Sequence, residues 1–195
     1  STGVSGPGAA SYDQAAVSVQ YISGRGGTVA QISRAFFEFD TSGISSAPSA
    51  ATLKIYGWSQ TSADVIAVRG DQSGTLGNTD FDEIYGCASQ LAASDGAGTG
   101  TLASCATNYS NEITSWTSLA YNDITLNSTA LSEMASLDTF KVVLVEYDAD
   151  YLDVASVGST PLVRTGMFWE NYTGTSRDPK IDYTAATGYG HAVMG

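Results

Sequence analysis

The chain has few charged residues and very few that are basic. Of its 195 residues 14% are charged, and 8 Lys and Arg against 20 Asp and Glu give a net charge of −12. Binding a nucleic-acid backbone requires clustered cations, so this balance excludes nucleic acid as the natural partner. It also argues against binding to anionic membranes. No apolar run approaches the length needed for membrane insertion.

Histidine and cysteine are equally scarce, with 1 His and 2 Cys. His191 lies in a Gly-rich segment, where no packed element would orient it as the base of a nucleophilic site. One His and two Cys do not complete a zinc site. Glu38 and Asp40 lie on one face of an expected strand, whereas a glycosidase needs two carboxyls facing across a cleft. We therefore expect a protein that is not an enzyme, with hydrolysis as the least favoured alternative.

Small and hydroxylated residues are abundant instead, with 25 Ser, 21 Thr and 21 Gly. With so little Lys, this composition is typical of secreted or particle-surface modules, so we expect an extracellular location. The first residue is Ser and no basic-then-apolar leader follows, so we expect a removed leader or a piece of a longer protein. Cys87 and Cys105 bracket a loop whose closure would contribute about 3 kcal/mol, which predicts a disulfide. The alternative is two unrelated small core residues.

Short runs of alternating apolar and polar residues, separated by turn residues, indicate β-strands. They cover residues 17–21, 35–40, 51–58, 65–69, 124–126, 140–147, 165–172 and 180–184. Residues 142–145 are apolar on both faces, which predicts a central strand. One short helix is expected, capped by Asn127 or Ser128. The fold class is therefore all-β, a jelly-roll-type β-sandwich over residues 12–184, with a flexible arm at 1–11 and a Gly-rich connector at 185–195.

Aromatic residues are the strongest candidates for a binding site. Flat rings stack on sugar rings, and neighbouring amides and carboxylates bond the hydroxyls. The rings placed outside the expected core or beside loops are Tyr56, Trp58, Tyr109, Trp116 and Tyr172. The same rings would equally serve a second sheet or a subunit interface.

An acidic run follows the expected central strand. Asp148, Asp150 and Asp153 alternate with other residues on a loop, where carboxylate oxygens can bind Ca²⁺. The spacing is not that of an EF-hand loop, and a solvated turn is the simpler alternative. No other cofactor is indicated.

Four strand segments occur in a familiar order. Residues 34–40 (RAFFEFD) precede 51–56 (ATLKIY), and 166–170 (GMFWE) precede 178–183 (DPKIDY). This order resembles the DNRLRE-type domain, a β-sandwich module of secreted bacterial and archaeal proteins related to carbohydrate-binding modules. The middle of the chain departs from that family, because its tryptophan-rich segment is represented only by 115–117 (SWT) and the Cys-bracketed loop is extra.

The tail carries a second resemblance. Residues 188–195 (GYGHAVMG) resemble the Gly-rich segments that end structural proteins of marine bacteriophages. Together the two resemblances imply a structural or attachment module of a virion or another extracellular surface. Its expected partners are a glycan or host-surface polymer, neighbouring structural subunits, or both. The alternative is a carbohydrate-binding module of a secreted bacterial enzyme or adhesin.

Overall fold

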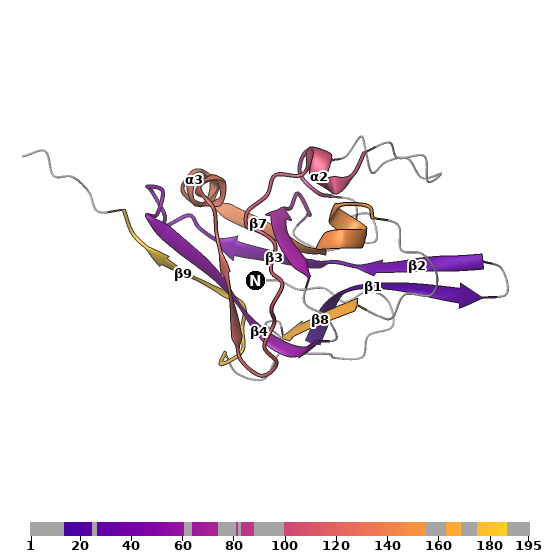
Figure 1. Ribbon diagram of the computed structural model, residues 1–195. Helices are drawn as coiled ribbons and strands as arrows, with labels where there is room; N and C mark the ends of the chain where they lie inside the picture. Colours follow the sequence, from indigo (N-terminus) through magenta and orange to yellow (C-terminus); the bar gives the residue numbers. More distant parts are fainter. Residues whose placement is uncertain are drawn as a thin grey trace, which may run out of the picture.

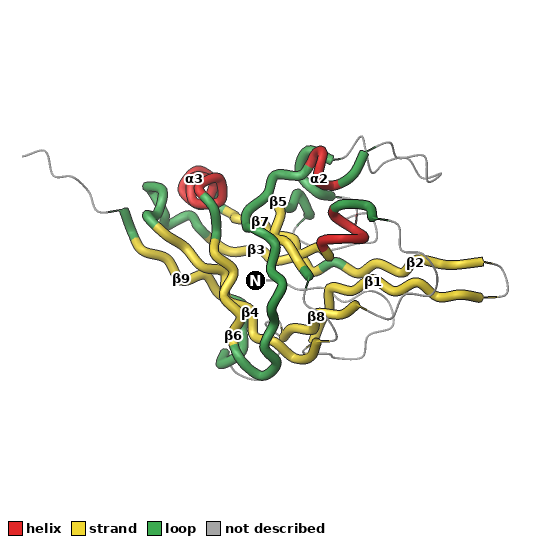
Figure 2. The backbone as a smooth tube through the Cα atoms, viewed as in Figure 1, coloured by secondary structure: helices red, strands yellow, loops and turns green. Residues whose placement is uncertain are grey.

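The protein is described here from a computed structural model, which describes residues 14–24, 27–60, 64–73, 81, 83–87, 100–154, 163–168 and 175–186. The expected arm at 1–11 lies outside these residues, as does the expected connector at 185–195 apart from its first two residues. Figure 1 shows the chain as a ribbon, and Figure 2 shows that strands and loops dominate it.

Strands make up most of the regular structure in the described part of the chain. They are β1(Gln14–Gly24), β2(Gly27–Ser33), β3(Ala35–Asp40), β4(Ala50–Gln60), β5(Val65–Arg69), β6(Tyr121–Thr125), β7(Thr139–Glu146), β8(Val163–Phe168) and β9(Lys180–Thr184). Three short helical segments accompany them, α2(Leu102–Cys105), α3(Ser128–Ser136) and the π-helical turn η2(Tyr147–Tyr151). The expected all-β class is confirmed. Strand β2 was not expected from the sequence.

The strands form two antiparallel sheets. The larger has the order β2-β1-β8-β4-β6, and the smaller has the order β3-β7-β5. Strand β4 is long enough to serve two neighbours on one edge, because β9 pairs with its first half and β8 with its second half. The opposite edge of β4 pairs with β6.

The main core lies between the two sheets, so the arrangement is sandwich-like. Strand β4 shows why the sequence folds this way. Leu53 and Ile55 are fully buried, whereas Lys54 between them is partly exposed. The facing sheet contributes Phe37 from β3 and Phe140 from β7. Large apolar side chains at every second position thus fill the space between the sheets.

Strand β7 is buried on both faces, as its continuous apolar run predicts. Val142 and Leu144 belong to the core between the sheets, whereas Val143 and Val145 belong to a second apolar cluster behind the smaller sheet. Segments far apart in the chain cover that second face, including α2 and η2. The predicted disulfide between Cys87 and Cys105 is confirmed. It links the segment that ends at Cys87 to the end of α2, within the layer that covers this face.

The expected short helix is also confirmed. The Asn127 side chain caps α3 by accepting a hydrogen bond from the Ala130 backbone amide at 3.1 Å. Ala130 and Met134 turn into the core between the sheets. Among the helices that the structure describes, none has the length and apolar character to span a membrane.

Candidate functional site

The best candidate for a binding site is the outward side of the larger sheet, where β4 lies between β6 and β9. We call it the outer face. It is formed by Lys54, Tyr56, Trp58, Tyr121, Asp123, Thr125, Lys180 and Asp182. These residues alternate along their strands with core residues such as Ile55 and Ile124, which fixes them on the solvent side.

The strand register arranges these side chains in rows across the sheet. Lys54 lies opposite Asp123 on β6 and opposite Lys180 on β9, while Tyr56 lies opposite Tyr121. The Lys54 amino group donates to the Asp123 carboxylate at 2.6 Å, which raises the pKa of Lys54 above its usual value. Hydrogen-bond donors, acceptors and rings therefore follow one another across the outer face.

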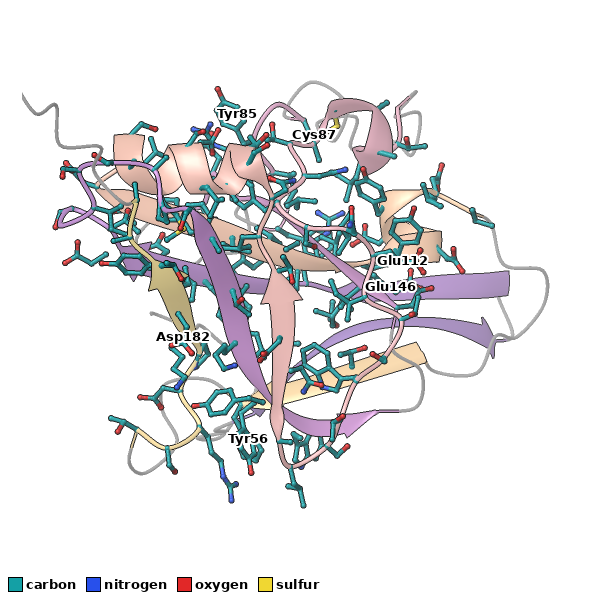
Figure 3. The ribbon with its side chains drawn as sticks, turned by 60° about the vertical axis from the view of Figure 1, so that its left-hand side comes forward. Tyr56, Tyr85, Cys87, Glu112, Glu146 and Asp182 are labelled. Carbon is teal, nitrogen blue, oxygen red and sulfur yellow. A yellow bond between two sulfur atoms is a disulfide. The ribbon has the colours of Figure 1, made fainter. Side chains whose placement is uncertain are left out.

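Two of the aromatic residues of the outer face, Tyr56 and Tyr121, form a pair. The rings of Tyr56 and Tyr121 meet edge to face, with centroids 5.2 Å apart. Lys180 lies 4.9 Å above the Tyr121 ring, and Arg177 lies 5.2 Å from the Tyr56 ring. With Lys54, three of the 8 basic residues of the chain gather here, although the protein as a whole is acidic. Figure 3 shows Tyr56 and Asp182 on the same side of the molecule.

A turn at the end of the outer face is held in an uncommon conformation. Leu119 has φ of 61°, a left-handed value that costs a non-glycine residue roughly 1–2 kcal/mol. The Asn122 side chain braces this turn through hydrogen bonds with the Thr117 amide at 2.6 Å and carbonyl at 2.9 Å. The Tyr56 hydroxyl donates to the Leu119 carbonyl at 2.6 Å. The turn thus leaves the Leu119 side chain 64% exposed beside the tyrosine pair.

A polar groove of about 380 Å³ adjoins the outer face along β6. Asp123 and Thr125 form one wall, and residues 110–115 form the other. Its lining is mostly hydroxyls, amides and carboxylates, the groups that bond to sugar hydroxyls. The groove and the outer face share Asp123 and Thr125, so one extended polymer could contact both.

The structure places the aromatic residues of the predicted binding platform in different environments. Tyr56 and Trp58 are half-buried on the outer face, and Tyr172 lies outside the described residues. Tyr109 and Trp116 are buried, and for them the prediction of a surface platform is wrong. Tyr109 stacks on Phe140 with centroids 4.7 Å apart, and its hydroxyl donates to Glu133.

Trp116 is drawn inward by a close fit to strands β4 and β8. Its indole nitrogen donates to the Gly166 carbonyl at 3.0 Å. Gly57 makes room for this loop, because a Cβ at that position would lie 2.1 Å from the Thr117 carbonyl oxygen and 2.9 Å from the indole nitrogen. The loop that carries Trp116 therefore packs against the core. Its position between strands in the sequence did not indicate this.

The three predicted calcium ligands also separate. Both oxygens of the Asp150 carboxylate accept hydrogen bonds from Arg34, at 2.6 and 2.8 Å, while Asp148 and Asp153 are exposed. No group of three His, Cys, Asp or Glu side chains within the described ranges is placed to hold a metal ion. The three carboxylates are therefore not brought together as a set of ligands in this structure, because the Asp150 carboxylate is paired with Arg34.

Sequence reasoning missed an acidic cluster beside the groove. Asp64 lies near Glu112, Glu146 and Asp148, and burial together with these charges raises the pKa of Asp64 to about 7. Like charges close together oppose each other's ionisation, so the Asp64 carboxyl keeps its proton to a higher pH. Burial likewise raises the pKa of Glu146. Figure 3 shows Glu112 beside Glu146, residues that are distant in the chain.

Comparison of the chain with models of protein families, with curated proteins and with solved structures found no match in any of the three.

Proposed function

We propose that this protein is a non-catalytic attachment module of an extracellular or virion surface, and that its outer face binds a glycan or a similar host-surface polymer. One observation carries the proposal, namely that the tyrosine pair and an alternating set of donors and acceptors lie together on a broad sheet face. The C–H groups of a sugar can stack on the tyrosine rings of such a face, while its polar side chains form hydrogen bonds with the sugar hydroxyls.

The electrostatics of the face favour a neutral or acidic polymer over a basic one. Lys54, Arg177 and Lys180 place positive charge around the rings, and Asp123 and Asp182 supply acceptors. The remainder of this acidic protein repels polyanions at long range. Contact with sugars therefore depends on short-range stacking and hydrogen bonds, which suits reversible attachment.

We also propose that the sandwich has jelly-roll connectivity. The orders β1-β8-β4-β6 and β3-β7-β5 are those expected when a folded-over pair of antiparallel ribbons supplies both sheets. Residues Asn108 and Ile113 form isolated antiparallel bridges to β5, in the position of a fourth strand for the smaller sheet. Strands β2 and β9 are then additions to this arrangement.

The alternative function is a carbohydrate-binding module of a secreted bacterial enzyme or adhesin. It uses the same outer face and differs in what the module is attached to. The resemblance of residues 34–40 and 51–56 to the DNRLRE-type domain favours this alternative, and the resemblance of residues 188–195 to phage structural proteins favours the virion.

A glycan array with the whole chain tests the proposal. We expect binding to at least one class of glycan, and Tyr56→Ala should weaken it about tenfold because a ring stack is lost. Tyr183→Ala is the matched control, since Tyr183 is a 51% exposed tyrosine on β9 outside the outer face. Asp182→Asn provides a second outer-face variant that leaves the rings in place.

Three results would count against sugar binding at the outer face. They are an array without any bound glycan, binding that survives both outer-face variants, and an equal loss in the Tyr183→Ala control. Release of new reducing ends from the bound glycan would instead revive the hydrolase alternative, with Glu112 in the groove as the first residue to substitute.

A further inference from the structure

Strand β2 ends the larger sheet and lies at the edge of a long hairpin. Strand β1 pairs with β8 from Gln14 to Val19 and with β2 from Ser18 to Gly24. Beyond Val19, β2 is the only partner of β1 among the described strands. In Figures 1 and 3 this part of the hairpin extends away from the other described strands.

The hairpin strands carry no charge, in contrast to the other strands at sheet ends. Neither β1 (QAAVSVQYISG) nor β2 (GTVAQIS) contains Asp, Glu, Lys, Arg or Pro. Among the other end strands, β6 carries Asp123, β9 carries Lys180 and Asp182, and β3 carries Glu38 and Asp40. Charged residues and prolines are the usual devices that stop an edge strand from pairing with another chain. Strand β2 lacks them.

A two-stranded ribbon that extends from its sheet is marginally stable in water and leaves one row of backbone donors and acceptors to solvent. Addition of a further strand satisfies those groups and does not require a particular side-chain sequence. The edge is therefore suited to pairing with a strand that also lacks charge.

We propose that β2 pairs antiparallel with β2 of a second copy of this chain, joining two larger sheets into one. The edge is self-complementary, because a two-fold axis at the middle residue sets Ala30 opposite Ala30 and Val29 opposite Gln31, with no like charges in register. Each copy carries a net charge of −12, and contact through an uncharged edge adds no like-charge repulsion at the interface itself. A second copy supplies such an edge automatically, which is why we favour it over an unrelated partner.

This inference goes beyond the proposed glycan binding, and it uses a different surface from the outer face. Because the bulk charge opposes association and salt screens it, self-association should strengthen as salt rises. A contact built on ion pairs would weaken under the same change.

Sedimentation equilibrium of the whole chain across the micromolar range, at low and high salt, measures the association. We expect a monomer–dimer equilibrium that shifts toward dimer at high salt. Ala30→Lys should weaken it at least tenfold, because two lysines would meet at the two-fold axis. Thr184→Lys is the matched control on β9, another strand at a sheet end, and should leave the dimer intact.

A cysteine at the axis provides a readout that does not depend on weakening the hairpin. Under mild oxidation Ala30→Cys should form a covalent dimer, whereas Thr184→Cys should not. A monomer under all conditions, a dimer that weakens with salt, equal effects of the two lysine variants, or a dimer in which Ala30→Cys does not cross-link would each overturn the proposal. Glycan binding by the Ala30→Lys monomer is measured separately, so failure of one proposal is distinguishable from failure of the other.

Discussion

The buried ion pair between Arg34 and Asp150 allows a sharp test of what stabilises the layer that covers the second apolar cluster. The Arg34 guanidinium donates to both oxygens of the Asp150 carboxylate, at 2.8 and 2.6 Å. The two side chains are only 4% and 3% exposed. A further Arg34 nitrogen donates to the Phe81 carbonyl at 2.6 Å, so this one side chain ties the start of β3 to η2 and to residue 81.

Asp150→Asn keeps the shape of the side chain but leaves the arginine buried without a counter-charge. We expect the free energy of unfolding to fall by about 3–5 kcal/mol, because an uncompensated buried charge is costly. The matched control is Asp123→Asn, which breaks the 2.6 Å pair between Lys54 and an Asp123 side chain that is 57% exposed. Its loss should be much smaller, since water solvates both groups of an exposed pair.

Urea unfolding followed by circular dichroism, with the disulfide intact, measures both losses. The double variant Arg34→Met with Asp150→Leu should regain much of the stability, because it removes the charge along with its partner. Added calcium should leave the midpoint of the wild-type protein unchanged, since arginine holds both Asp150 oxygens. If Asp150→Asn proved no more destabilising than Asp123→Asn, the assignment of this pair as a buried support would be refuted.

Two more expectations concern stability. Because the folded pKa of Asp64 is raised from 3.8 to about 7, its contribution is fully present below about pH 4 and is lost as pH rises toward 7. The upper limit is about 4 kcal/mol, and solvent screening of this partly exposed carboxyl reduces it to about 1–2 kcal/mol. Asp64→Asn should flatten that part of the stability profile, measured by urea unfolding at several pH values, and an unchanged slope would contradict the assignment. Reduction of the Cys87–Cys105 disulfide, which closes a loop of sequence separation 18, should lower the free energy of unfolding by about 3 kcal/mol. Equal urea midpoints with and without reductant would show that the loop contributes nothing.

Much of the fold could be read from local patterns. Alternation predicted β3, β4 and β9, because residues on one face of each, such as Phe37, Leu53 and Ile181, pack in or against the core between the sheets. The continuous apolar run predicted β7 because both of its faces are covered. Strand β2 was missed because it is short, begins at the end of the glycine-rich residues 23–27 and carries little alternation of its own. Its strand conformation depends on antiparallel pairing with β1, which its own sequence does not predict.

The candidate site was only partly predictable. Tyr56 follows from the alternation in β4, so its outward position could be predicted from the sequence. Tyr109 and Trp116 belong to irregular segments, where periodicity does not tell which way a side chain turns. The partner of Asp150 is Arg34, 116 residues earlier, and such a pairing has no local signature.

The sequence by itself determined the class of fold, the disulfide, the helix cap and the overall acidity, because periodicity, loop closure and net charge depend on neighbouring residues or on simple sums. Only the tertiary structure decided which aromatic rings reach the surface, which carboxylates lie close together and which edge strand lacks charge. These properties depend on residues brought together from distant parts of the chain, and burial and electrostatic interaction act through space rather than along the sequence.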